Sequence, residues 1–285
     1  MTDSLFEQVF ARPDDDAPRV VLADHLCELG DPRGEFISIQ LTEPNGATGL
    51  AKGRAKQLKR HYEAWLPPGV QRSTAVFRRG FLHACRWMAP TLATHREWRL
   101  VERLECGNVN GVAGFPRDTL FSGTVLPRLK ELGGADPSVF ATLCESGLRS
   151  RVEILRTFYL PFEHLAGRIR AVAQFPALQT LDLEGTELPA DGLSIVLRHL
   201  GALKRVQVDD LGSRLPLRGV REALPRGLTL SISVDRDRLC WFEFFGDEVR
   251  LCHRRSSSAY LRGHLIDRAR REGLSASLVA VDDLP

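Results

Sequence analysis

The chain has 285 residues, of which 43% are hydrophobic and 26% charged. This composition is typical of a folded globular protein and excludes wholesale disorder, a collagen-like chain and a disulfide scaffold. The length suits one large domain or two modest ones, and the formal net charge of +3 gives no strong indication of an acidic or basic partner.

The charge is unevenly distributed along the chain. Residues 1–35 hold nine acidic residues against three Arg, whereas residues 52–103 hold twelve Lys and Arg against three Glu. The basic stretch is predicted either to pair with the acidic head or to meet nucleic acid or anionic lipid. We favour the first interpretation, because the basic residues are spread over a helix, a loop and a strand with no aromatic-interleaved motif.

Targeting and cofactor motifs are missing from the sequence as given. There is no signal-peptide pattern and no run of 18 apolar residues, so we expect a cytoplasmic protein that does not contact a membrane. The six cysteines lack C-x-x-C spacing and are expected to be reduced. No phosphate-binding glycine loop, zinc motif or nucleophile motif occurs, so we expect no cofactor, no metal and no catalytic residue.

Hydrophobic periodicity predicts helices over residues 2–10, 18–29, 34–41 and 50–66. In the second of these, Pro18 suits the first turn and Gly30 the C-terminal stop. Its expected buried positions are Val21, Leu22, Leu26 and Leu29. In the fourth, the buried positions are Leu58, Tyr62 and Trp65.

Residues 13–37, PDDDAPRVVLADHLCELGDPRGEFI, closely resemble the bacterial repeat-companion domain, whose usual run is D-x-P-R-L-V-Y-A-D-W-L-E-E-x-G-D-P-R-G-E-F-I. Residues 57–66 and 78–87 are similar to later parts of that family. This chain departs from the pattern at His25, where the family has Trp, and at Cys27, where it often has Glu. The resemblance implies a helical domain ahead of leucine-rich-type repeats in a bacterial protein, and it implies no reaction.

The polar residues of this motif have two interpretations. They could form a ligand or metal site, or they could cap helices, close a tight turn at residues 31–34 and form ion pairs that fix a helix junction. We favour the structural interpretation, because Asp-Pro-Arg-Gly is typical of a rigid turn. The residues are Asp24, His25, Asp31, Arg33 and Glu35.

Residues 79–215 contain internal repeats of the form L-x-x-L-x-L. The clearest is LQTLDL at residues 178–183, and related runs begin at Val101, Leu129 and Leu203, while around residues 149–157 either Val152 or Leu155 can be the central residue. With Leu155 the repeats are spaced by 23 to 28 residues, within the leucine-rich-repeat range of about 20–29. A degenerate strand over residues 81–87 precedes them. Helical patterns separate the strands at residues 89–98, 137–145, 161–175 and 188–200.

The predicted fold class is therefore α/β: a leucine-rich-repeat-like solenoid, with a curved parallel sheet inside and helices outside. The predicted domains are a helical repeat-companion domain (1–78), which covers the N-terminal end, the solenoid (79–215) and a small C-terminal α/β unit (216–285). In that last unit we expect strands at 228–234, 239–245, 248–253 and 274–281 and a helix at 258–272. A hairpin through Gly246-Asp247 would pair Glu243 with Arg250 and bury Phe242, Phe244, Val249 and Leu251, and Cys240 and Cys252 would lie on opposite faces without a disulfide.

Between the buried positions of each repeat, alternate side chains are expected to point out of the concave sheet. These side chains mix both charges with one aromatic, which suits recognition of a protein by complementary polar groups. The predicted partner-binding residues are Arg103, Glu105, Glu131, Arg156, Phe158, Thr180, Asp182, Glu184, Arg205, Gln207 and Asp209.

The leading functional hypothesis is a non-enzymatic interaction protein that recognises a protein partner through this concave face. One alternative is an enzyme or enzyme regulator whose ligand site lies where the N-terminal motif meets the first repeats. A second alternative is nucleic-acid binding through residues 52–103, which a steep salt dependence of binding would support. The same outward-pointing side chains are also compatible with a solvated sheet face that binds no partner.

Overall fold

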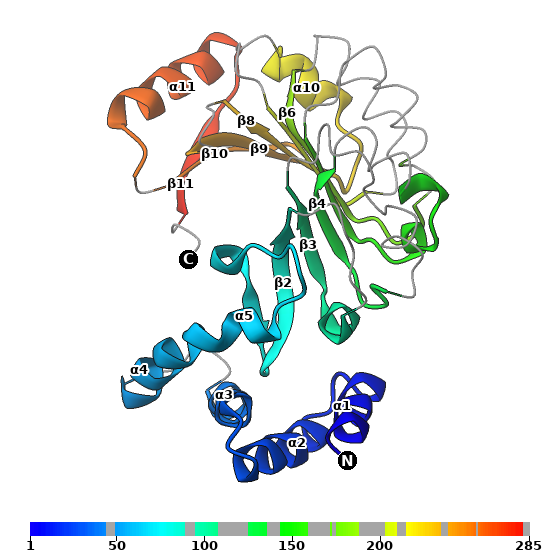
Figure 1. The fold of residues 1–285 in the computed structure, drawn as a ribbon. Helices are drawn as coiled ribbons and strands as arrows, with labels where there is room; N and C mark the ends of the chain where they lie inside the picture. The colour runs from blue at the N-terminus through cyan, green and yellow to red at the C-terminus, as the bar shows by residue number, and fades with distance from the viewer. Residues whose placement is uncertain are drawn as a thin grey trace. The chain divides into compact units, whose positions relative to one another are not determined.

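In the computed structural model the chain is an α/β protein with one long, mostly parallel sheet that does not close on itself (Figure 1). The structure describes residues 1–43, 49–88, 95–107, 125–135, 143–158, 172, 175–187, 203–209, 215–234, 239–254 and 256–281. The predicted helices between the repeat strands fall almost wholly outside these ranges, and only fragments of them, such as residues 143–145, are described.

The N-terminal segment folds into short helices close to the predicted positions. The four predicted helices appear as α1 (Thr2–Ala11), α2 (Ala17–Glu28), α3 (Pro32–Thr42), α4 (Gly49–Leu58) and α5 (Tyr62–Trp65), with 3-10 turns η1 (Lys59–His61) between α4 and α5 and η2 (Arg72–Thr74) after α5. Leu58, Tyr62 and Trp65 are buried as expected.

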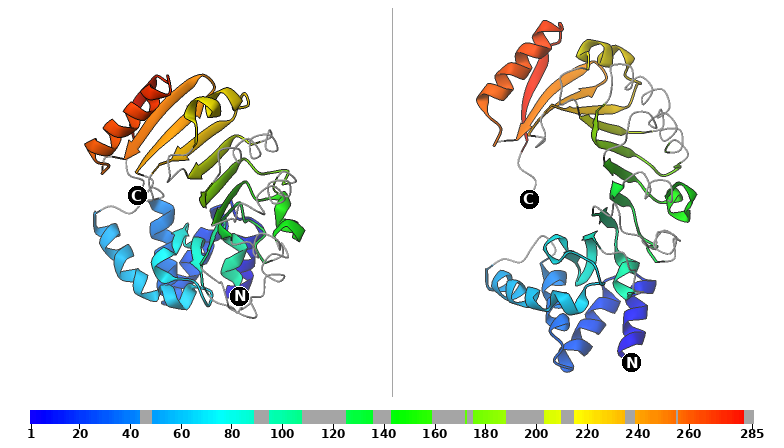
Figure 2. Two further views of the ribbon diagram at one scale, coloured as in Figure 1. Left: turned by 90° about the horizontal axis from the view of Figure 1, so that it is seen from above. Right: turned by 45° about the horizontal axis from the view of Figure 1, so that its top comes forward.

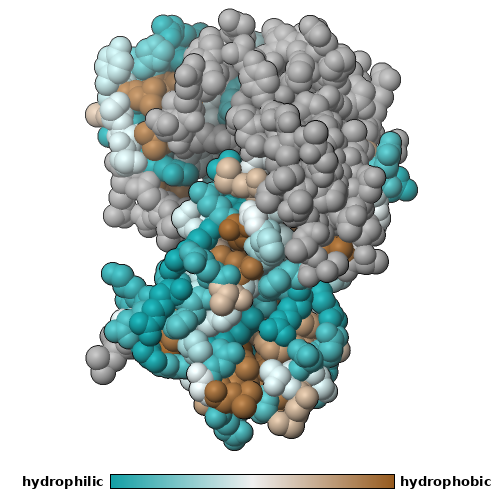
Figure 3. Space-filling model, in the orientation of Figure 1, coloured by the Kyte–Doolittle hydropathy of each residue, from teal (hydrophilic) through white to brown (hydrophobic). Residues whose placement is uncertain are grey.

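The buried side of α2 is narrower than its sequence indicates. Leu22 and Leu26 are buried, but Val21 and Leu29 are 53% and 63% exposed, so the prediction for these two was wrong. Val21 lies about 100° around the helix from Leu22, and Leu29 follows the last helical residue, where the chain turns away. The space-filling view shows hydrophobic surface over the region of α2, among hydrophilic residues (Figure 3).

The predicted turn at residues 31–34 is the first turn of α3, which begins two residues earlier than expected. The Gly34 N–H donates to the Asp31 carbonyl at 3.0 Å, and the Asp31 carboxylate accepts from the Arg33 N–H at 2.9 Å. Asp31 is therefore an N-cap, and Pro32 stands at the helix start, where its missing N–H costs nothing.

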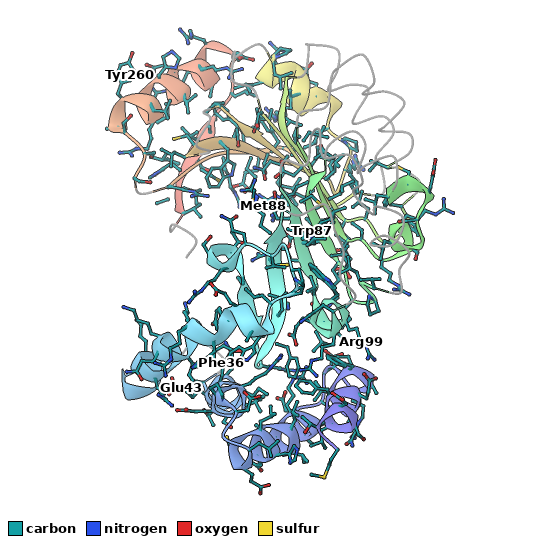
Figure 4. The ribbon with its side chains drawn as sticks, viewed as in Figure 1. Phe36, Glu43, Trp87, Met88, Arg99 and Tyr260 are labelled. Carbon is teal, nitrogen blue, oxygen red and sulfur yellow. The ribbon has the colours of Figure 1, made fainter. Side chains whose placement is uncertain are left out.

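An aromatic cluster joins the helices to the first strands. Phe36 of α3 contacts Tyr62 and Trp65 at ring-centroid distances of 5.5 and 5.3 Å, and Phe77 lies 5.6 Å from Phe36 (Figure 4). A second group of buried residues, including Phe6, Phe10 and Phe81, packs α1 and α2 against the second strand. These contacts bury the apolar faces that the sequence periodicity indicates.

The sheet contains eleven strands in chain order: β1 (Val76–Arg78), β2 (Phe81–Trp87), β3 (Arg103–Cys106), β4 (Glu131–Ala135), β5 (Ile154–Phe158), β6 (Thr180–Glu187), β7 (Arg205–Asp209), β8 (Thr229–Ser233), β9 (Cys240–Phe245), β10 (Glu248–Arg254) and β11 (Ala276–Val281). Pairs β2–β3, β5–β6, β6–β7, β7–β8 and β10–β11 are parallel, whereas β1–β2, β8–β9 and β9–β10 are antiparallel. Two 3-10 turns, η3 (Arg96–Leu100) and η4 (Gly147–Ser150), lie between strands.

The register resolves the ambiguity around residues 149–157 in favour of Leu155. Leu155 is opposite Leu181, which is opposite Val206, which is opposite Leu230. All four side chains are fully buried. Val152 is buried too, but it precedes the strand. The strand predicted at 228–234 thus continues the parallel series as β8.

The C-terminal hairpin has the predicted register, with Phe244 opposite Val249 and Phe242 opposite Leu251. Gly246 has the positive φ of +55° that the turn requires. Glu243 and Arg250 are opposite each other, as predicted, while the shorter ion pairs of these two side chains are Arg250–Glu248 at 2.8 Å and Glu243–Arg205 at 3.2 Å. Neither Cys240 nor Cys252 forms a disulfide, as predicted. The predicted final helix is α11 (Ala259–Arg271), and it begins at the N-cap Ser258.

The chain divides into two compact units. The first unit contains Met1–Leu132 and Ser146–Leu148, and the second contains Gly133–Glu145 and Arg149–Pro285. In the second unit, α10 (Leu217–Ala223) and α11 lie on the same side of the strands (Figure 2). The Arg268 side chain of α11 donates at 2.8 Å to the carbonyl of Leu215, two residues before α10.

Candidate functional site

Strands β5 to β10 of the second unit carry apolar residues on one face and polar residues on the other. Alternation along each strand places Val206, Ile232 and Phe242 in the core, on the side that α10 and α11 cover. The intervening residues form a row on the opposite face. Because the register aligns the strands, the row contains Arg156, Asp182, Gln207, Ser231, Glu243 and Arg250 in that order. We call this surface of β5 to β10 the polar sheet face.

The polar sheet face contains a pocket of about 450 Å³. Five predicted binding residues line it, together with four others from the same unit. The predicted ones are Arg156, Thr180, Asp182, Arg205 and Gln207, and the others are Ile154, Ser233, Trp241 and Arg254. Three guanidinium groups and one carboxylate therefore line a volume large enough for one or two amino-acid side chains.

Arg205 is held in place by two neighbours on the face. Its Nη2 donates to the Ser231 hydroxyl at 3.1 Å and to the Glu243 carboxylate at 3.2 Å, while 44% of the Arg205 side chain stays exposed. A guanidinium positioned in this way has donors left for a ligand, since it carries five N–H groups. Arg205 is therefore a preorganised cation rather than a freely moving one.

Cys252 lies beside the same carboxylate, with its Sγ 3.9 Å from the second oxygen of Glu243. Burial and the negative charge of Glu243 raise the pKa of the Cys252 thiol to about 11. The thiol is therefore neutral at physiological pH and acts as a weak donor to Glu243. This environment is the opposite of one that activates a cysteine nucleophile.

Ser233, Trp241 and Arg254 were not predicted as site residues. Ser233 and Trp241 are opposite each other across β8 and β9, and the Ser233 hydroxyl is buried without a hydrogen-bond partner among the described residues. The alternation of residues 228–234 and the hairpin register already placed Ser233 and Trp241 on this face. The sequence left open whether the C-terminal strands extend the repeat sheet or cap its open end. In the structure they extend it: β8 pairs parallel with β7, and β9 and β10 follow in antiparallel pairs.

The remaining predicted binding residues do not line this pocket. Arg103 and Glu105 of β3, and Glu131 at the start of β4, belong to the first unit. Asp209 lies on the polar sheet face but is only 7% exposed. Phe158 and Glu184 are opposite each other in β5 and β6, and their side chains lie outside the described part of the structure.

The polar residues of the N-terminal motif are distributed over separate structural tasks. Arg33 is buried and bonds Glu97 at 2.6 Å, Glu35 pairs with Arg54 at 2.6 Å, and the His25 ring lies 2.9 Å from the Thr2 hydroxyl. Asp24 is exposed. These side chains do not converge on one pocket among the described residues, which supports the structural interpretation of the motif.

Several residues of the acidic head pair with the basic stretch. The ion pairs are Glu35–Arg54, Asp16–Arg79, Asp3–Arg96 and Glu7–Arg99, at 2.6 to 3.4 Å. Arg99, labelled in Figure 4, also stacks 4.4 Å above the Phe10 ring. Part of the positive charge of residues 52–103 is thus neutralised within the first unit.

In the part of the chain that the structure describes, no three His, Cys, Asp or Glu side chains gather in a way that could hold a metal ion. None of the described helices combines the length and apolar character needed to cross a membrane. No protein-family model and no curated protein matches this chain. The similarity to the repeat-companion domain therefore stays a prediction from the residues.

Proposed function

We propose that the protein is a binding module whose polar sheet face holds an extended segment of a partner protein that carries carboxylate side chains. The observation that carries this proposal is the pocket on that face, which is lined by Arg156, Arg205 and Arg254 and by a single, nearly buried carboxylate, Asp182. Planar guanidinium groups bind carboxylates through two parallel hydrogen bonds. The half-buried Trp241 adds an apolar wall, and aromatic side chains of this kind are enriched where proteins bind one another.

The mixture of charges favours a protein partner over a nucleic acid. Asp182, Glu243 and Asp209 all belong to the polar sheet face and would repel a phosphate backbone. A peptide can satisfy both signs, with its carboxylates on the arginines and its donors on Glu243, whose side chain is 20% exposed. Mixed charge also supplies specificity, because a partner with the wrong charge pattern is repelled.

We further propose that the parallel strands form a leucine-rich-repeat-like solenoid. In support, the aligned buried residues Leu155, Leu181, Val206 and Leu230 are 24 to 26 residues apart, within the range of about 20–29 for such repeats. Repeat proteins of this class use an extended sheet face as their binding surface. The proposal assigns no reaction to the protein.

Selection from a display library of random peptides tests the function. The wild-type protein should enrich peptides with Asp or Glu, and the double variant Arg156→Gln, Arg205→Gln should lose that enrichment. The matched control is Arg218→Gln, which removes an arginine of α10 whose side chain is 74% exposed. The proposal fails if the wild type enriches no peptides, or if the double variant and the control select the same acidic peptides as the wild type.

A further inference from the structure

A second pocket, of about 90 Å³, lies entirely within the first unit. It is formed where four segments meet: the α1–α2 loop with the first turn of α2, the β1–β2 hairpin, the residues just before β3, and the residues just before β4. Eleven residues line it. They are Pro13, Asp14, Arg19, Arg78, Arg79, Phe81, Leu82, His83, Leu100, Glu102 and Arg128.

Positive charge predominates in this pocket. Four guanidinium groups line it against two carboxylates, an excess of two positive charges. Arg128 bonds both carboxylates, Asp14 and Glu102, at 2.8 Å. Just outside the lining, Lys130 pairs with Glu102 and Asp16 pairs with Arg79, so these two outer charges cancel. Arg78 has no ion-pair partner among the described residues and is exposed.

Arg19 contributes a buried cation with an unused donor. Its two terminal nitrogens donate to the carbonyls of Asp15 and Pro13 at 2.7 and 2.6 Å, while its Nε has no partner. Only 4% of the side chain is exposed, and loss of solvent lowers the pKa of the guanidinium. Asp16, which is half exposed, lies 3.9 Å from Arg19 and also pairs with Arg79, so it compensates this buried cation only loosely. A bound anion would therefore stabilise the arrangement further.

The position of Arg79 indicates that an arginine is needed at this place. Arg79 and Gly80 form the two-residue turn of the β1–β2 hairpin, with φ of +53° and +82°. Asn or Gly normally occupies the first position of such a turn, because a positive φ strains other side chains. Arg79 nevertheless stands there, and its side chain bonds the Asp14 carbonyl at 3.2 Å and lines the pocket. Backbone strain of this kind, here the positive φ of Arg79, is found most often at functional positions.

We propose that this pocket binds a phosphate group, as free inorganic phosphate or as the phosphoryl end of a small monoester. The excess of two positive charges matches a phosphate dianion, and the volume suits the phosphoryl group alone, with the remainder of an ester projecting outward. Guanidinium groups are the side chains that recognise phosphate most effectively. The site is independent of the polar sheet face, so it can be tested separately from the proposed protein partner.

His83 provides a reporter inside the pocket. Burial lowers its pKa, Glu102 opposes this effect, and Arg78, Arg103 and Lys130 add to it. A bound phosphate would favour the imidazolium and raise the His83 pKa. An NMR titration of the His83 ring, with inorganic phosphate and with chloride at equal ionic strength, measures this shift directly.

Calorimetric titration of the full chain with inorganic phosphate and with glycerol phosphate tests the site and separates its two possible ligands. Arg78→Gln and Arg79→Asn should each weaken binding about tenfold or more. Arg79→Asn should leave the unfolding midpoint unchanged or raise it, because Asn-Gly suits the turn. If Arg79 had only a structural role, its replacement would lower the midpoint instead. Arg60→Gln, an exposed arginine outside the pocket, is the control.

Tighter binding of one ligand identifies whether the free ion or the ester is preferred. The inference is overturned if the wild type binds neither ligand at millimolar concentration, or if it binds them with the same affinity as both pocket variants. An unchanged His83 pKa in saturating phosphate would overturn it as well. If Arg79→Asn does not fold, the Arg78→Gln variant still tests the site, because Arg78 is exposed and its replacement should not disturb folding.

Discussion

At the scale of single residues, Arg33 determines how the first unit packs. Its side chain is buried, donates to Glu97 at 2.6 Å and lies 4.7 Å from the Phe81 ring centroid. Glu97 in turn accepts the Leu82 N–H at 3.1 Å, so this ion pair links α3, η3 and β2. A buried pair of this kind fixes one arrangement of its elements, because either charge left alone in the core would be strongly destabilising.

We therefore expect Arg33→Met to lower the free energy of unfolding by about 3–5 kcal/mol, because Glu97 would be left charged and buried. Adding Glu97→Gln should recover part of this loss, since the amide oxygen can still accept from Leu82. Urea unfolding of the two single variants and the double variant measures the coupling. A loss below about 1 kcal/mol for Arg33→Met would contradict this role.

Gly34 marks the closest approach of α2 and α3. A Cβ at this position would lie 2.6 Å from the Ala23 carbonyl oxygen and 2.6 Å from the Cys27 nitrogen, both backbone atoms that cannot move aside. We expect Gly34→Ala to cost about 1–3 kcal/mol through overpacking. Gly53→Ala is the matched control, because nothing lies near its Cβ position in α4, and it should stabilise the protein by about 0.5–1 kcal/mol. Equal effects of the two substitutions on the thermal midpoint would show that the contact does not matter.

At the scale of elements, local patterns predicted most of the secondary structure. The L-x-x-L-x-L runs identified the strands because their buried residues must recur at the same register position. The Gly246 turn identified the hairpin. What these patterns could not provide were the partners of charged side chains, such as Glu97 for Arg33, which is 64 residues away in the sequence. Arg205 likewise pairs with Glu243 of a strand that is two positions away in the sheet.

The 3-10 turn η3 depends on a histidine in its neutral form. The His95 Nδ1 accepts the Glu97 N–H at 3.3 Å, which an imidazolium could not do. Burial lowers the pKa of His95, Glu97 opposes this effect, and Arg96 and Arg33 add to it; the His83 pKa is lowered too. The folded protein thus takes up these protons at a lower pH than the unfolded chain.

The stabilising contribution of the two histidines is therefore fully present above pH 6.5, their ordinary pKa, and is lost as the pH falls below it. His95→Asn keeps an oxygen acceptor for the Glu97 N–H and should reduce the slope of unfolding free energy against pH between 6.5 and 5. Gly53→Ala, which removes no titratable group, should leave the slope unchanged. Identical slopes for His95→Asn and the wild type would contradict the capping role.

At the scale of the whole molecule, the sequence predicted the class of the fold and part of the site. Repetition of buried leucines implied a mostly parallel sheet, and alternation then implied that Arg156, Asp182 and Gln207 share a face. Neither pattern could indicate that Trp241 and Arg254, from the C-terminal strands, complete a pocket with them, because that depends on β8 pairing parallel to β7. The sequence offered a ligand site where the N-terminal motif meets the first repeats, but it could not identify the residues of the second pocket, since these come from segments between Pro13 and Arg128.

We propose that the polar sheet face binds an acidic segment of a partner protein. NMR chemical-shift mapping tests it most directly, with the full chain and the acidic peptide of highest affinity from the display selection. We expect the largest shifts at Arg156, Asp182, Gln207 and Trp241, with little change along α10 and α11. Shifts confined to the first unit, or to α10 and α11, would contradict it.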